Sequence, residues 1–373
     1  MNIFYSLLQK LCTNSVEFKP LNQCCKVLDG KRKPVNKTVR KAGKYPYYGA
    51  NGIQDYVSDY IFDGAFVLVG EDGSVVTPNG TPVVKWAEGK IWDNNHAHII
   101  SGTEGVLLRY LYHYLQTVNI KPLIHGNIPK LTGGDFKALE IPIPPLAVQE
   151  EIVRILDKFT ELEAELEAEL EARKKQYEWY RDRLLSFDED VPEIQVNTLE
   201  NCCVILDNKR QPITKSSRMQ GDYPYYGANG IQDYVTDYIF DGTYILVGED
   251  GSVSTANGAP VVNWASGKIW VNNHAHIISE KEGVLLRYLY YYLQTINVQP
   301  FIHGNIPKFT GKDFRSLRIL IPPIEEQRRI VTILDRLDAL CNDITTGLPA
   351  EIAARRKQYE YYRDKLLSFE EVA

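Results

Sequence analysis

The hydrophobic positions in the first third of the chain fall into short runs separated by turn residues. Ile61-Phe62, Phe66–Val69 and Pro82–Val84 are such runs, and Asp72-Gly73 lies between two of them. Short apolar runs bounded by Gly, Asn and Asp are typical of β-strands. Residues 105–115 instead repeat apolar positions every three or four residues, as one helix would. We therefore expect a compact, mostly β core with at least one helix packed on it.

From Val148 to Phe187 the pattern becomes that of a long amphipathic helix. This stretch contains no Gly or Pro, and its apolar residues recur every three or four positions among Glu, Lys and Arg. A helix of about 40 residues would be ~60 Å long. The stripe predicted to pack against another helix consists of Ile155, Phe159, Leu162, Leu166, Leu170, Tyr177, Tyr180 and Leu184.

A second stretch, from Glu325 to Phe369, carries a matching stripe but contains a helix-breaking sequence. Gly347-Leu348-Pro349 is expected to end one helix and begin another, because Gly is favoured after a helix C-terminus and Pro in a first helical turn. The second stripe consists of Ile333, Leu337, Leu340, Ile344, Tyr359, Tyr362 and Leu366.

Two helices with matching apolar stripes need partners. The simplest arrangement packs them against each other as an antiparallel coiled coil, with one module at each end and a pseudo-twofold axis between the modules. The alternative is that each stripe packs on its own module or on another chain. The predicted fold class is α+β, with two similar β-rich modules separated by two long helices.

The module is present twice. Residues 45–145 recur at 223–323 without a gap, and 78 of the 101 paired residues are identical. Patterning alone can preserve a fold while the surface varies, so identity that extends through the loops indicates that both copies recognise the same kind of ligand. The predicted segments are an N-terminal helix at 1–15, modules at 16–147 and 191–324, and helical spacers at 148–190 and 325–373.

Composition is that of an ordinary globular protein, with 44% hydrophobic and 24% charged residues. No apolar run approaches the ~20 residues that a membrane span needs, so a cytoplasmic location is expected. The six cysteines, which include the adjacent pairs Cys24-Cys25 and Cys202-Cys203, have no CxxC spacing. They are expected to be reduced thiols.

Charge is distributed unevenly, and its distribution matters more than the net charge of −6. Residues 1–146 carry 16 Lys and Arg against 12 Asp and Glu, whereas 147–192 carry 7 against 14. Residues 31–44 hold seven Lys and Arg and no acid. A polyanion responds to such local charge, so the acidic total does not exclude a nucleic-acid partner.

Catalytic motifs are absent from the sequence. It contains no GxxxxGK[ST] phosphate loop and no Gly-rich S-adenosylmethionine motif, and Asn127-Ile128-Pro129 is not the Asn-Pro-Pro-aromatic tetrad of amino-methyltransferases. His96 and His98, repeated as His274 and His276, form the most metal-like cluster, but no carboxylate or Cys follows at ligand spacing. A hydrogen-bonded structural role is favoured, and neither a metal nor a cofactor is expected.

Basic and amide side chains in the repeated loops favour DNA binding. Lys and Arg neutralise phosphates, and Arg, Lys and Asn can read base edges. A charged, solvated loop is the alternative. The candidate DNA-binding residues are Lys31, Arg32, Lys33, Lys37, Arg40, Lys44, Asn51, His125, Asn127 and Lys130 in the first module, and Lys209, Arg210, Lys215, Arg218, Asn229, His303, Asn305 and Lys308 in the second.

The order of module, Pro-Pro exit and long helix, given twice, resembles the specificity subunit of type I restriction–modification systems. The most specific segments are IPIPPLAVQEEIVRILD at 141–157, with its copy at 319–335, and the helix ends ARKKQYEWYRDRLLSF at 172–187 and ARRKQYEYYRDKLLSF at 354–369. Glu-Leu-Glu-Ala, which occurs three times between 161 and 172, is similar to the tetrapeptide repeats of that family, whose copy number alters the spacer between half-sites.

The resemblance implies a non-catalytic subunit in which each module, a target recognition domain, binds one half of a bipartite double-stranded DNA site. The helices would dock two methyltransferase (modification) subunits, and a restriction–translocation subunit would join the complex. Near-identical modules imply half-sites that are the same or nearly the same, in inverted orientation. Two other classes stay open, namely a stand-alone DNA methyltransferase or nuclease, and a duplicated scaffold that binds protein or carbohydrate.

Overall fold

A computed structural model describes residues 16–73 and 75–369. The helix predicted at 1–15 lies outside these residues, as does Cys12. The chain forms two compact units, one made of residues 1–166 with 352–373 and the other of 167–351. Each unit therefore combines one module with parts of both spacers. The segment boundaries proposed from the sequence stay predictions.

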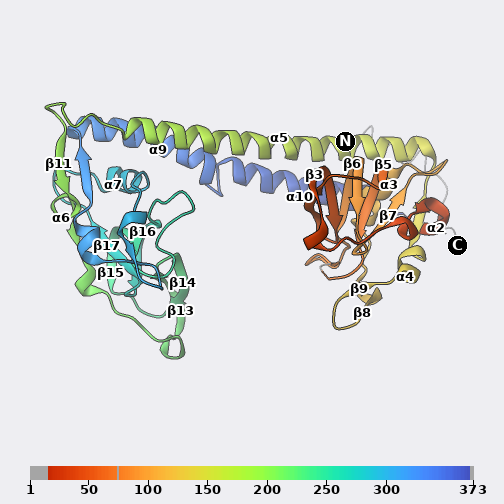
Figure 1. Ribbon diagram of the computed structural model, residues 1–373, viewed down its shortest axis with the longest axis horizontal. Helices are drawn as coiled ribbons and strands as arrows, with labels where there is room; N and C mark the ends of the chain where they lie inside the picture. Colours follow the sequence, from red (N-terminus) through yellow and green to blue (C-terminus); the bar gives the residue numbers. More distant parts are fainter. Residues whose placement is uncertain (1–15, 74, 370–373) are drawn as a thin grey trace. The chain divides into compact units, whose positions relative to one another are not determined.

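The module of the first unit is built on a six-stranded sheet (Figure 1). Its β3 and β6 run parallel to each other, and its other neighbouring strands are antiparallel. In spatial order the strands are β2 (Lys26–Val27), β7 (Ala97–Ser101), β5 (Phe62–Gly70), β6 (Val84–Asp93), β3 (Ala42–Gly49) and β4 (Gly52–Val57).

Shorter elements complete this module. Two small antiparallel pairs accompany the sheet, and three short helices lie around it. The pairs are β1 (Glu17–Pro20) with β10 (Glu140–Ile143), and β8 (Ile124–His125) with β9 (Lys130–Leu131). The helices are α2 (Leu21–Cys24), α3 (Leu108–Leu115) and α4 (Gly133–Lys137), with 3-10 turns η1 (Asp29–Lys31), η2 (Lys37–Val39) and η3 (Lys121–Leu123).

The central strand β5 is buried on both faces. Val67 and Val69 pack in one cluster with Leu111 of α3, whereas Phe66 and Leu68 pack in another cluster with residues of β3, β6 and β7. Alternate residues of a strand point to opposite faces, so a continuous apolar run is what a central strand requires. The predicted β core is confirmed, and the helix within 105–115 begins at Leu108.

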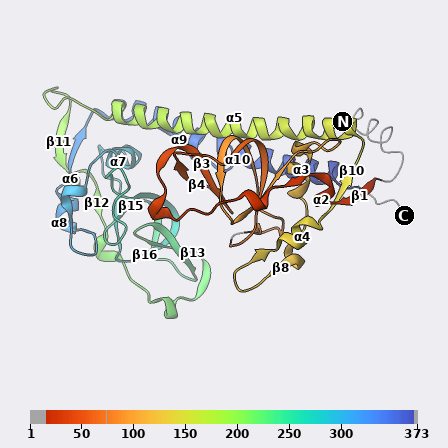
Figure 2. The ribbon, with the colours of Figure 1, turned by 45° about the vertical axis from the view of Figure 1, so that its right-hand side comes forward.

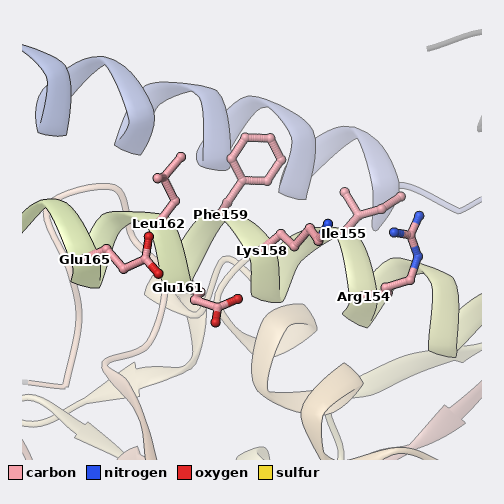
Figure 3. A pocket seen from close by; sticks show the side chains of 7 residues that line it. All are labelled: Arg154, Ile155, Lys158, Phe159, Glu161, Leu162 and Glu165. Carbon is pink, nitrogen blue, oxygen red and sulfur yellow. The ribbon is translucent and has the colours of Figure 1, made fainter.

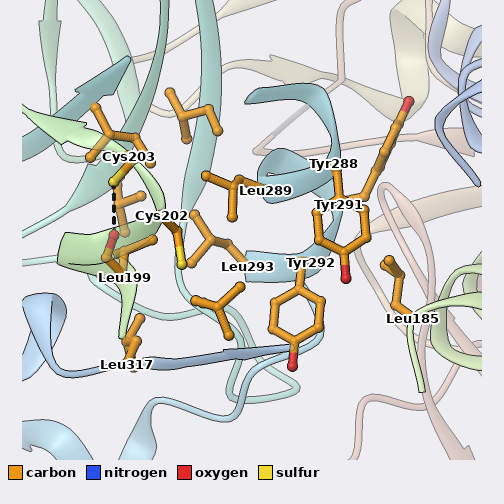
Figure 4. Packing of buried hydrophobic residues seen from close by; sticks show 14 of the residues in the cluster. Leu185, Leu199, Cys202, Cys203, Tyr288, Leu289, Tyr291, Tyr292, Leu293 and Leu317 are labelled. Atoms are coloured by element: carbon orange, nitrogen blue, oxygen red, sulfur yellow. Dashed lines mark hydrogen bonds between the residues drawn. The ribbon is translucent and has the colours of Figure 1, made fainter. Parts of the chain in front are cut away.

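The module of the second unit repeats these elements in the same order, and its sheet has the equivalent strand order β12-β17-β15-β16-β13-β14. Figure 4 shows its buried cluster, in which Cys203 Sγ lies 3.2 Å from the carbonyl oxygen of Leu199. The strands are β11 (Gln195–Thr198), β12 (Val204–Ile205), β13 (Gln220–Gly227), β14 (Gly230–Val235), β15 (Phe240–Gly248), β16 (Val262–Val271), β17 (Ala275–Ser279), β18 (Ile302–His303), β19 (Lys308–Phe309) and β20 (Arg318–Ile321). The helices and turns are α6 (Leu199–Cys202), α7 (Leu286–Leu293), α8 (Gly311–Arg315), η4 (Asp207–Lys209), η5 (Lys215–Ser217) and η6 (Gln299–Phe301).

The predicted long helices are present. The first is α5 (Leu146–Leu184), and the second stretch is divided into α9 (Ile324–Asn342) and α10 (Leu348–Leu366). The predicted break is thus confirmed. A Cβ at Gly347 would lie 2.5 Å from the carbonyl oxygen of Ala339, so only glycine fits where the chain passes the end of α9.

Within the first unit, α10 runs antiparallel to the beginning of α5 (Figure 2). Phe159 stacks on Tyr362 with ring centroids 5.4 Å apart, and Arg356 Nε donates to Glu163 Oε1 over 2.7 Å. Residue numbers therefore rise along one helix as they fall along the other. The antiparallel pairing predicted from the stripes is confirmed here.

Within the second unit, the later part of α5 pairs with α9, and these two helices are also antiparallel (Figure 1). Tyr177 lies near Asp338, and burial together with the charge of Asp338 raises the pKa of the Tyr177 phenol. Three residues earlier on α5, Lys174 lies near Cys341. Tyr177, Leu334 and Cys341 belong to the buried cluster of this unit. The helices thus contribute to the core of the module as well as to each other.

Not every predicted stripe residue lies in a seam. Tyr180 and Leu340 are exposed, and Ile344, which falls in the break between α9 and α10, is 80% exposed. Tyr177, Tyr359 and Leu366 are buried, and the other stripe residues are half-buried. Among the described residues no helix combines the length and apolarity needed to cross a bilayer.

Candidate nucleic-acid interface

The basic loop that precedes β3 is fixed to the sheet by two arginines. Arg32 Nη1 donates to Glu71 Oε2 and to the carbonyl oxygen of Ala97, each over 2.5 Å, and its side chain is only 12% exposed. Arg210 repeats these contacts with Glu249 and Ala275. Both arginines were DNA-contact candidates, but their donors are directed into the protein. We therefore assign them to holding the loop in place.

Arg40 has the same kind of role. Its guanidinium lies 4.0 Å from the centroid of the Tyr47 ring, its Nε donates to Val35 O over 3.0 Å, and Asp55 accepts from it at 3.5 Å. Arg218 makes the equivalent contacts in the second module. Stacking on an aromatic face and bonding a carboxylate use the whole planar group. The loop is thereby braced at two points.

The lysines of the same loop point into solvent. Among the residues that the structure describes, none of them forms an ion pair. They are Lys31, Lys33, Lys37, Lys44, Lys209 and Lys215, all exposed. Mobile ammonium groups on a braced loop are suited to neutralising phosphates. The structure therefore separates this basic segment into arginines that support it and lysines that are free to contact a ligand.

A second exposed feature is the β8–β9 hairpin, which carries His125, Asn127 and Lys130. It is held against the end of β5, since Leu131 N donates to Glu71 O over 2.8 Å. Lys130 Nζ lies 3.2 Å from Glu71 Oε1, so one carboxylate contacts both the hairpin and the basic loop. At the tip, Ile128 is 69% exposed.

The second module keeps the hairpin with its tip residue. Ile306 is 72% exposed, Lys308 Nζ lies 3.6 Å from Glu249 Oε1, and His303 and Asn305 are exposed. His125 and His303 also lie within 3.5 Å of the first-turn acids of α4 and α8. An apolar tip beside a lysine, present in both copies, is a surface that a ligand can cover.

The third feature is the turn between β3 and β4. Asn51 is exposed at the tip of this turn. Gln54 folds back over Gly49, so that its Nε2 lies 2.1 Å from the position that a Cβ of Gly49 would take. Gln54 Oε1 accepts from Asn94 Nδ2 over 3.3 Å. The second module repeats this arrangement with Asn229, Gly227, Gln232 and Asn272. Gln54 and Gln232 were not among the sequence candidates, although amides are the usual partners of adenine.

The histidine cluster is part of the support. His98 Nδ1 lies 2.7 Å from Asp29 Oδ2, its Nε2 lies 3.0 Å from Leu131 O, and its ring stacks on Phe136. Despite burial, hydrogen bonding and charge from His98 hold the pKa of Asp29 below its ordinary value. His98, Asp29 and Glu71 could hold a metal by proximity, but Arg32 lies against both carboxylates and balances their charge. The structural role favoured from the sequence fits these contacts.

The two modules differ sharply at one buried position. Asp93 is fully buried and neither of its carboxylate oxygens has a hydrogen-bond partner, whereas the equivalent residue is Val271. Burial raises the pKa of Asp93 to about 8, against the opposing charge of Arg32. The first module thus contains a buried acid that the second lacks.

The segment after the Pro-Pro exit joins the module to the helix. Gln149 Oε1 accepts from Leu107 N over 2.9 Å, and its Nε2 donates to Gly105 O and Pro144 O. Gln327 makes the equivalent bonds in the second unit. These glutamines are fully buried, so the helix start is fixed to the module loop by one side chain.

One groove lies on α5 within the first unit. It has a volume of about 420 Å³ and is lined by Ile155, Phe159 and Leu162 with charged neighbours at its rim. Figure 3 shows these three side chains directed toward the adjacent helix. The groove therefore lies along the predicted stripe of α5.

Duplicated modules with braced loops and paired helices define a bipartite recognition protein, and comparison with known proteins gives the family. Residues 14–172 and 193–354 both match the family described as Type I restriction modification DNA specificity domain. The chain belongs to this family.

Relatives and solved structures agree with the family. A Haemophilus influenzae protein named as a type I restriction enzyme specificity subunit is 39% identical over 394 aligned residues, which cover 98% of each chain. The EcoR124I/EcoR124II specificity subunit of Escherichia coli is 34% identical over 70% of this chain and 71% of its own length. The S subunit structure from M. genitalium, at 17% identity, covers 95% of this chain and 97% of its own with a TM-score of 0.60, and so shows the fold.

Proposed function

We propose that this chain is the sequence-specific DNA-binding subunit of a type I restriction–modification complex. The observation that carries the proposal is that both family matches fall on modules that expose equivalent loops. In each module a lysine-bearing loop, an amide-bearing turn and a hairpin with an exposed isoleucine tip are fixed to one sheet. Lysines position a protein on phosphates, and amides read bases.

We propose that Lys31, Lys33, Lys37 and Lys44 contact phosphates, together with Lys209 and Lys215 of the second module. Asn51, with Gln54 beside it, is proposed to read a base edge, and Asn229 does the same in the second half. The hairpin residues His125, Asn127 and Lys130, with their copies His303, Asn305 and Lys308, form the remaining contact surface.

Because the modules are nearly identical, we propose that the DNA target is an interrupted palindrome. Two copies of one reader related by a pseudo-twofold axis would bind the same half-site in inverted orientation. The antiparallel helix pairing inside each unit supports this proposal.

Catalysis is assigned to partners in this proposal. Two methyltransferase subunits would dock on the helical regions, and a restriction–translocation subunit would join them, with this chain in the cytoplasm. One solved structure that resembles this chain is titled as concerning complex assembly and conformational transition of the type I R-M system. A stand-alone methyltransferase, nuclease or carbohydrate-binding scaffold receives no support from the family match.

Co-expression with the methyltransferase subunit, followed by mapping of methylated sites, tests the proposal. A bipartite methylated motif that disappears when this chain is omitted is expected. Methylation by the purified chain alone would contradict the assignment, as would DNA affinity that does not depend on salt. Deleting one Glu-Leu-Glu-Ala unit is expected to change the gap between half-sites, since four helical residues add ~6 Å.

A further inference from the structure

The two modules expose equivalent loops, so a difference between their half-sites must come from substituted positions. In the basic loop, which we assign to phosphates, Lys33 and Lys44 are replaced by Gln211 and Asp222. Seven of the 23 substituted positions between 45 and 145 are buried in the first module, such as Val67, which becomes Ile245, and Leu131, which becomes Phe309. Lys85, which is replaced by Asn263, is different because it lies beside the β3–β4 turn. This pair is the one substitution that we place next to a proposed base-reading element.

Both side chains lie beside the turn glycine. A Cβ built on Gly52 would lie 3.6 Å from Lys85 Cε, and one built on Gly230 would lie 3.1 Å from Asn263 Oδ1. Each side chain therefore covers the turn whose tip carries Asn51 or Asn229. The β6 strand places Lys85 on the same face as Ala87, which packs with Tyr48 of β3.

Neither side chain has its polar group committed elsewhere. Lys85 is exposed and makes no ion pair with any residue that the structure describes. Asn263 is half-buried, and its Nδ2 is a buried atom with no hydrogen-bond partner among the described residues. A half-turn of the amide group would exchange Nδ2 with Oδ1. An unmade hydrogen bond costs free energy, and once the amide has turned, a ligand acceptor beside the turn would satisfy the nitrogen.

The two side chains offer different hydrogen-bonding groups. The lysine ammonium only donates, and so suits the two acceptors O6 and N7 of guanine. The asparagine amide both donates and accepts, and so suits the N7 acceptor and N6 donor of adenine. We propose that position 85/263 is a specificity-determining residue, with Lys85 selecting guanine and Asn263 adenine at the equivalent base of the two half-sites. This inference rests on the proposed function.

Other substitutions on the sheet are less suited to this role. Asp93, replaced by Val271, is buried beneath the surface. Glu88, replaced by Ser266, lies on the opposite face of β6, where its Oε2 is 3.5 Å from Nε1 of Trp86, a ring that packs on Tyr112 of α3. The Glu88→Ser substitution is therefore a matched control that changes charge on the same strand.

The test uses the full chain in complex with the methyltransferase subunit and random double-stranded DNA. Wild type, Lys85→Asn, Asn263→Lys, the double exchange and Glu88→Ser are each subjected to binding selection. Each substituted residue already occupies the equivalent position of the other module, so the fold should tolerate it. Thermal unfolding checks that the variants are folded. In wild type we expect half-sites that agree except at one position, with guanine in one and adenine in the other.

Lys85→Asn should make the two half-sites the same, with a change of base preference at that position of roughly 5- to 150-fold, the range that one good base contact provides. Asn263→Lys should also make the two half-sites the same, with guanine instead of adenine at that position. Glu88→Ser should leave the motif unchanged. An unchanged motif with Lys85→Asn and Asn263→Lys overturns the inference while leaving the proposed function intact. Failure of wild type to select any bipartite motif overturns the proposed function itself, and the inference with it.

Discussion

Arg109 Nε donates to Asp157 Oδ1 over 2.7 Å and so joins α3 of the first module to α5. His113 Nε2 lies 2.7 Å from the same oxygen, and hydrogen bonds from both residues hold the pKa of Asp157 below its ordinary value despite partial burial. In the second unit Arg287 and Tyr291 meet Asp335 in the same way. The final Asp of the ILD sequence thus fixes each helix to its own module.

Replacing this carboxylate should loosen the helix from the module. We expect Asp157→Asn to lower the free energy of unfolding by about 1.5–3 kcal/mol, because two charged hydrogen bonds are weakened and buried His113 loses its carboxylate. Urea denaturation measures the loss. Glu151→Gln removes an exposed ion pair with Arg154 on the same helix and should change stability by less than about 1 kcal/mol.

Asp93 should make the first module less stable as pH rises. Its folded-state pKa of about 8 lies above the ordinary value of 3.8, so unfolding between these values releases a proton. The free energy of unfolding contributed by this group therefore falls from about pH 4 to about pH 8 and is then constant. Asp93→Val should remove this slope and stabilise the protein by about 2–4 kcal/mol at pH 8.

The twin module supplies the reciprocal variant. Val271→Asp should introduce the same fall in stability with pH into the second unit, as measured by thermal unfolding at pH 5, 6.5 and 8. Equal stabilities of wild type and Asp93→Val across that range would contradict the assignment of an uncompensated buried acid.

Gly49 is required by the folded-back amide of Gln54. A methyl group at this position would displace that flexible side chain from Asn94, so Gly49→Ala should cost less than about 1.5 kcal/mol in stability. It should nevertheless weaken binding to the cognate site at least ten-fold if the amide is held ready for a base. Fluorescence anisotropy with cognate and scrambled duplexes separates the two effects. An equal loss on both duplexes would argue against base reading by Gln54.

Lysines and arginines of the basic loop should behave differently. Lys33→Ala and Lys37→Ala should each reduce the slope of log affinity against log salt by about 1, with no loss of stability. Arg32→Ala should instead destabilise the fold, because it leaves Glu71 without its guanidinium partner. Salt titrations of DNA affinity, combined with thermal unfolding, distinguish them. A stable Arg32→Ala protein with reduced salt dependence would mean that Arg32 contacts phosphate after all.

Periodicity predicted the modules, the long helices and the break at Gly347 because these features depend on local apolar spacing. It did not separate supporting from exposed basic residues. Arg32 and Lys31 are neighbours in sequence, and only the fold brings Glu71, which lies 39 positions away from Arg32, against one of them. Ile344 fitted the stripe by spacing, yet the break removes it from a helix.

Gln54 shows a second limit of sequence reasoning. Its glycine partner is five positions away, and only the turn between β3 and β4 folds its amide onto the strand. The identity of Gly49 and Gln54 in both copies was visible, but so was that of most other loop residues. The contacts made in the folded chain, rather than residue type, therefore decide which amides and cations remain available to a ligand.

Mapping of methylated sites in cells that express this chain with its methyltransferase subunit tests the central claim most directly. We expect one interrupted motif whose two halves are inverted copies of each other, apart from a single base at the position assigned to Lys85 and Asn263. Two unrelated half-sites, or two related halves in direct repeat, would contradict the claim that near-identical modules face the duplex about a shared twofold axis.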